Sequence, residues 1–178
     1  MTEEARITLQ ITGEEIDGFC REIVAASSNS GRRHATLVAL EGFIARFAGA
    51  DSHSPAYEAI LGRIRNFSEQ TRSDLLREQA AALDAALEQE DVAALGRIHA
   101  GLSRNGFSRI AGRIGQQMPS SRRQRTTAWL RQWCDQAEQA ARQASGWPDA
   151  MDFRAAGIDL QAYRAAKDIL IQLTEEHP

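Results

Sequence analysis

Three arginines stand in the first turn of a predicted helix, within the stretch PSSRRQRTTAWLRQWC. They are Arg122, Arg123 and Arg125. The first turn of a helix carries a partial positive charge, so each cation there costs about 0.3–1 kcal/mol. That same turn offers free backbone N–H groups to an anion, and a guanidinium group holds phosphate in a two-pronged geometry. These residue types at this position therefore predict recognition of an anion, and phosphate in particular.

The three arginines belong to a longer basic segment. From Val92 to Cys134 the chain contains no Asp or Glu. The arginines of this segment are Arg97, Arg104, Arg109, Arg113, Arg122, Arg123, Arg125 and Arg131. Nucleic acid is the commonest extended polyanion, and contacts to its phosphates need no base-specific side chains. The segment predicts a nucleic-acid-binding protein that is not an enzyme and that contacts the backbone of DNA or RNA.

Two other interpretations of the basic segment stay open. Carboxylates elsewhere in the fold, such as Glu78, Glu88 or Glu90, could neutralise it internally. The remainder of the chain is acidic enough to make this realistic, since the whole chain has a net charge of −3. Alternatively, the arginines could bind an acidic protein partner, which would make the chain a helical adaptor or regulatory protein, or the basic face could associate with an acidic face of a second copy.

The sequence predicts no catalytic residues, no metal site and no cofactor. The histidines lack metal-ligand spacing, the two cysteines are too isolated for a metal or redox motif, and no GxSxG motif occurs. The residues concerned are His34, His53, His99, His177, Cys20 and Cys134.

The composition is that of a globular protein. The chain has 178 residues, of which 43% are hydrophobic and 25% charged. No apolar run is long enough to span a membrane, and the acidic N-terminus MTEEARITLQ is unlike a signal peptide. We therefore expect a cytoplasmic protein with no membrane partner.

Helical periodicity dominates the chain, which is rich in alanine and has only four prolines. The fold class predicted is mainly α: a compact bundle of six to seven helices with one short N-terminal β-strand, in ARITLQIT, where apolar and polar residues alternate. We expect a single domain over 1–178. A boundary near 50–54 would instead separate 1–50, the strand and two helices, from a helical bundle at 54–178. The helices are expected over about 12–28, 33–48, 55–67, 73–89, 91–118 (interrupted near Asn105), 121–144 and from 159 onward.

Two resemblances follow from these features. RITLQIT with the two helices after it resembles a ribbon-helix-helix repressor, which implies that Arg6, Thr8 and Gln10 enter the DNA major groove. A short edge strand packed on the bundle or on a partner chain is the alternative. In size, helicity and basic segment, the chain is similar to the small helical subunits of CRISPR effector complexes. That resemblance implies a subunit of a larger nucleoprotein complex.

Overall fold

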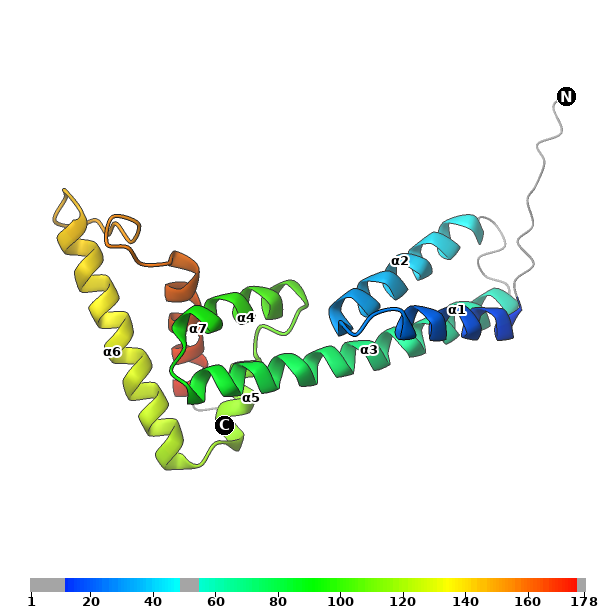
Figure 1. The fold of residues 1–178 in the computed structure, drawn as a ribbon, viewed down its shortest axis with the longest axis horizontal. Coiled ribbons are helices and arrows are strands. Elements are labelled where there is room, and N and C mark those ends of the chain that lie inside the picture. Colours follow the sequence, from blue (N-terminus) through cyan, green and yellow to red (C-terminus); the bar gives the residue numbers. More distant parts are fainter. Residues whose placement is uncertain (1–11, 49–54, 176–178) are drawn as a thin grey trace, which may run out of the picture. The chain divides into compact units, whose positions relative to one another are not determined.

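The structure is a computed structural model that describes residues 12–48 and 55–175 (Figure 1). In these residues the chain is mainly helical, as predicted, and forms seven helices. They are α1 (Gly13–Ala25), α2 (Ser30–Ala48), α3 (Pro55–Glu88), α4 (Val92–Arg104), α5 (Ile110–Gln117), α6 (Ser120–Ala144) and α7 (Leu160–Thr174). The predicted strand and the predicted boundary at 50–54 lie outside the described residues.

Short polar side chains fix where three of the helices begin. Thr12 and Glu15 form a capping box on α1, in which each side chain accepts a hydrogen bond from the other residue's backbone N–H. Asp91 caps α4 by accepting from Ala94 N, and Asp159 caps α7 by accepting from Gln161 N. Each cap satisfies a backbone N–H that has no partner within its own helix.

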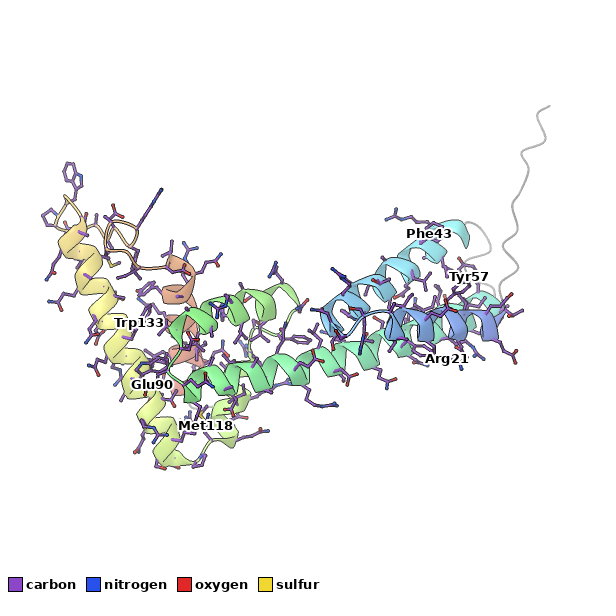
Figure 2. All side chains as sticks on the ribbon, viewed as in Figure 1. Arg21, Phe43, Tyr57, Glu90, Met118 and Trp133 are labelled. Carbon is purple, nitrogen blue, oxygen red and sulfur yellow. The ribbon has the colours of Figure 1, made fainter. Side chains whose placement is uncertain are left out.

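Left-handed residues end two of the helices. Gly106, with φ of 74°, follows the end of α4 at Asn105, as the Asn-Gly pair predicts. Glu90, labelled in Figure 2, has φ of 56° in the turn between α3 and α4. This turn lets the chain reverse from α3 into α4 within three residues.

The chain divides into two compact units, Met1–Leu76 and Arg77–Pro178. The division falls inside α3, which is one continuous helix and contributes residues to both units. The single domain over 1–178 stays a prediction.

In the first unit, α1, α2 and the first part of α3 enclose a core. Its buried residues are Ile16, Cys20, Leu37, Ile44, Leu61 and Ile64. A polar link crosses this unit: His34 Nδ1 lies 3.1 Å from Ser68 O and 3.2 Å from Ser68 Oγ. Tyr57 OH donates to Ile44 O and ties the start of α3 to α2.

The sequence predicted two helices where α3 is continuous, and polar residues on its buried face explain the error. Ser68 and Thr71 are buried, and they interrupt the apolar stripe between Ile64 and Leu75. Thr71 Oγ1 donates to Ser68 O at 2.9 Å, so the buried hydroxyl is satisfied within the helix. The polar residues that interrupt the apolar stripe therefore lie inside one continuous helix, which accommodates their hydroxyl groups.

In the second unit, α7 (orange to red in Figure 1) packs against α4, α5 and α6. Small residues allow these close approaches. A Cβ added to Gly96 of α4 would lie 3.0 Å from the backbone N and Cα of Ala162 in α7. One added to Gly115 of α5 would lie 2.4 Å from Leu173 Cδ2. The core of this unit is assembled on α7, and Leu83 and Leu87 of α3 join it.

We predict that Gly96→Ala destabilises the second unit. Overpacking costs about 1–3 kcal/mol, and here the obstacle is backbone that cannot rotate away. The gain in helix propensity, about 0.8–1 kcal/mol, offsets only part of this cost. All three tryptophans lie in the second unit, so urea unfolding followed by their fluorescence measures the loss.

Gly101→Ala is the matched control on the same helix. Its added Cβ would lie 3.4 Å from Gln79 Nε2, an ordinary contact, so unchanged or higher stability is expected. Equal destabilisation by the two variants would show that the close approach at Gly96 does not limit packing.

Candidate functional site

Arg122 is held by two carboxylates of α3. Its Nη2 donates to Asp84 Oδ1 at 2.9 Å and to Asp84 O at 3.2 Å. Its Nε lies 2.8 Å from Glu88 Oε2, at ion-pair distance but without hydrogen-bond geometry. The side chain is only 21% exposed. Arg122 therefore brings two negative groups to the positive end of α6, which offsets the cost of a cation in the first turn.

Arg123 serves the end of another helix. Its Nε and Nη2 both donate to Leu173 O, at 2.9 and 2.6 Å, in the last turn of α7. The last carbonyls of a helix carry partial negative charge and lack partners within the helix, so a cation is favourable there. The charge of Arg123 is thus unfavourable at the N-terminus of α6 but favourable at the C-terminus of α7.

The other six arginines of the basic segment are exposed. They are Arg97, Arg104, Arg109, Arg113, Arg125 and Arg131. We call them the exposed arginines. Arg104 Nε donates to Ala100 O of its own helix at 3.2 Å. Among the residues that the structure describes, none of the six forms an ion pair with a carboxylate.

Four of the exposed arginines form two pairs according to their positions on the helices. Arg97 and Arg104 are seven residues apart and share one face of α4, opposite the buried Leu95 and Leu102.

Arg109, at the start of α5, and Arg113 are four residues apart and are neighbours on one face. Arg125 and Arg131 are separated by about 120° around α6, so they do not share a face. The structure thus gives two paired sites and two single arginines where the sequence suggested one band.

A polar network holds α5, which carries Arg109 and Arg113. Gln172 of α7 donates from Nε2 to Ser108 O at 2.7 Å and accepts from Gly112 N at 3.2 Å. Gln172 Nε2 also donates to Asp168 Oδ2, and the same oxygen lies 2.7 Å from His99 Nε2 of α4. One network therefore ties α4, the start of α5 and α7 together, and fixes the backbone between the two arginines.

A second network joins α6 to α7. Tyr163 OH donates to Glu138 Oε1 at 2.5 Å, and Lys167 Nζ donates to the same oxygen at 2.9 Å and to Tyr163 OH at 2.8 Å. Arg142 Nη2 donates to Glu138 Oε2. The hydrogen bonds from Tyr163, and then from Lys167, lower the pKa of Glu138. Burial raises the pKa of Tyr163, so the phenol stays protonated.

The thiols are unsuited to nucleophilic chemistry. Cys20 and Cys134 are free and buried. Burial raises the pKa of Cys134 to about 11 and also raises that of Cys20, which disfavours the reactive thiolate. Within residues 12–48 and 55–175, no group of His, Cys, Asp or Glu is placed to hold a metal ion. Nor does any helix there have the length and apolar character needed to cross a membrane.

Sequence reasoning missed two features of this unit. Glu88 was among the carboxylates expected to neutralise the basic segment, and it does lie beside Arg122, but Asp84, four residues earlier on the same face, was not considered as a partner. Nor did the sequence point to the stretch after α6, where Trp147 is 76% exposed. Trp133, labelled in Figure 2, and Trp129 are half-buried against the core.

No protein family, no curated protein and no solved structure matches this chain. Any function must therefore be argued from the geometry itself.

We predict that Arg122→Ala lowers the stability of the second unit by about 1 kcal/mol, because it leaves Asp84 and Glu88 without their cation. Arg125→Ala is the matched control: it also removes a guanidinium group from the start of α6, but an exposed one, and should change stability by less than about 0.5 kcal/mol. Tryptophan-monitored urea unfolding of both variants makes the comparison. Equal stabilities would contradict the structural role of Arg122.

We also predict a pH-dependent contribution from Glu138. Its lowered pKa means that its stabilisation is present above the unfolded value of about 4.5, and is lost as pH falls through the folded value. Glu138→Gln should therefore destabilise the protein near neutral pH and matter less in acid. Urea unfolding of wild type and variant at about pH 7 and about pH 3.5 measures this difference. A difference that stays constant with pH would refute the prediction.

Proposed function

We propose that this protein binds nucleic acid through its phosphates and performs no catalysis. The observation that supports the proposal is the set of exposed arginines on α4, α5 and α6, none of which pairs with a described carboxylate. An exposed guanidinium group without an acidic partner keeps its donors available to a ligand. Nucleic acid adds a favourable entropy, because counterions leave its phosphates when the arginines replace them.

The fold supports a ready-made arrangement at Arg109 and Arg113. Arg109 is the residue just before α5 and Arg113 lies within it, and the first turn of this short helix is anchored to α7 through Gln172. Anchored backbone reduces the conformational freedom that binding would otherwise remove. Two arginines one helical turn apart suit phosphates that follow one another along a strand.

Contacts of this kind position a nucleic acid but do not read its sequence. Trp129 and Trp133 pack against the core, so they are not free to serve as stacking platforms for bases. We therefore infer binding with little dependence on base sequence. A subunit within a larger nucleoprotein complex fits such binding, since other components can supply the sequence recognition.

A partner protein with an acidic surface is the second candidate. The same exposed arginines favour it, because a carboxylate also accepts two hydrogen bonds from a guanidinium group. This alternative predicts an acidic protein that co-purifies and is not removed by nuclease.

Fluorescence anisotropy with labelled single- and double-stranded DNA and RNA tests the proposal. Binding should weaken steeply between about 50 and 200 mM salt. In the variant Arg109→Gln with Arg113→Gln, the slope of log Kobs against log salt should fall by about 0.7–0.9 for each phosphate that the variant no longer neutralises. Arg122 and Arg123 are unsuitable test positions because they hold helices together.

The control removes two arginines that already have acidic partners. Arg63 and Arg65 of α3 are 47% and 51% exposed and pair with Asp17 and Glu41. Arg63→Gln with Arg65→Gln should leave binding nearly unchanged. The proposal fails if this control weakens binding as much as the α5 variant, or if binding is indifferent to salt.

A further inference from the structure

The connector between α6 and α7 presents apolar side chains to solvent. Trp147 is 76% exposed, Met151 43% and Leu160 39%. Met151 and Leu160 also line a surface hollow whose other apolar walls are Phe153 and Ile158. We call residues 147–160 the connector surface. Large exposed apolar groups around a hollow are typical of interaction sites.

One hydrogen bond fixes this surface to α6, and a second closes a turn within it. Asp152 N donates to Ala141 O of α6 at 2.9 Å, and Ile158 N donates to Phe153 O at 2.8 Å. The ring of Phe153 packs on that of Tyr163 in α7, with centroids 4.4 Å apart. The exposed side chains are therefore carried by an anchored backbone, which is the condition for binding without a large ordering cost.

Charge indicates what the connector surface binds. It carries three carboxylates, Asp149, Asp152 and Asp159, against one cation, Arg154. Asp152, Arg154 and Asp159 line the hollow itself. A polyanion or an anionic lipid surface would be repelled here. A cation would be attracted by the carboxylates, and also by the exposed ring of Trp147 through a cation–π contact.

We propose that the connector surface is a docking site for a protein segment that carries apolar side chains flanked by lysine or arginine. An apolar side chain of the partner enters the hollow between Met151 and Leu160. A neighbouring cation lies against Trp147 and Asp149. This site is separate from the exposed arginines, and the inference does not depend on the proposed function.

The test uses two amphipathic helical peptides of about 18 residues, five turns, labelled with fluorescein. Both have leucine on one face; the other face is lysine and arginine in the first peptide and glutamate in the second. The basic peptide should bind the full chain, and the acidic one should bind about tenfold more weakly or not at all. Trp147→Ala and, separately, Asp149→Asn should each weaken binding of the basic peptide, and Trp147→Ala should raise its Kd by about tenfold.

Phe19→Ala is the matched control, because Phe19 is an aromatic residue of the first unit that is 50% exposed. It should leave peptide binding unchanged. The inference is overturned if the basic peptide does not bind, if the acidic peptide binds equally well, or if Trp147→Ala has no effect.

Two further readouts identify a different occupant. Dissociation of a homodimer by Trp147→Ala in sedimentation experiments would assign the surface to a second copy of the chain. A loss of nucleic-acid binding in the same variant would assign Trp147 to base stacking. Either result would overturn the proposal that a basic protein segment occupies the connector surface. Unchanged sedimentation and unchanged nucleic-acid binding would support that proposal.

Discussion

The close approach of three helices to α7 is the constraint on which the second unit depends. Gly96 leaves no room for a side chain above the backbone of Ala162, and Gly115 leaves none above Leu173. Dispersion and burial at such short separations reward side chains that are small and apolar. The inward faces carry glycine or alanine at the closest approaches, as at Gly96, Ala111 and Gly115, and larger apolar residues such as leucine elsewhere. Arginines on these helices can only lie outside the core or reach its edges.

The arginines consequently divide into two groups with different physical roles. Arg122 and Arg123 reach the edges, where they meet two carboxylates of α3 and the last turn of α7. Each satisfies charges or dipoles that another element leaves open, so the cost of a cation at the start of α6 is recovered in tertiary contacts. The exposed arginines have no such partner among the described residues, so their charged groups face solvent.

Charge is also distributed unevenly along the second unit. Two carboxylates of its helices are engaged by neighbouring side chains: Glu138 by Tyr163 and Lys167, and Asp168 by His99 and Gln172. The acids of the connector surface lie beside exposed apolar groups, and two of them, Asp152 and Asp159, accept hydrogen bonds only from backbone N–H groups among the described residues. The ligands that we propose for the two surfaces therefore differ in charge: the basic, polar surface on the helices repels what the acidic, apolar connector surface attracts.

The sequence by itself determined the helical class and the helix starts near Thr12, Asp91 and Asp159, because these depend on local periodicity and on side chains next to the backbone they serve. It also located every arginine of the candidate site. It could not show that α3 is continuous, since the partners that satisfy Ser68 and Thr71 are not evident from the apolar stripe alone. Only the tertiary structure decided which arginines form contacts within the protein. Asp84 and Leu173 lie 38 and 50 residues from their partners in the chain, and pairing over such separations is set by helix packing, which no local pattern encodes.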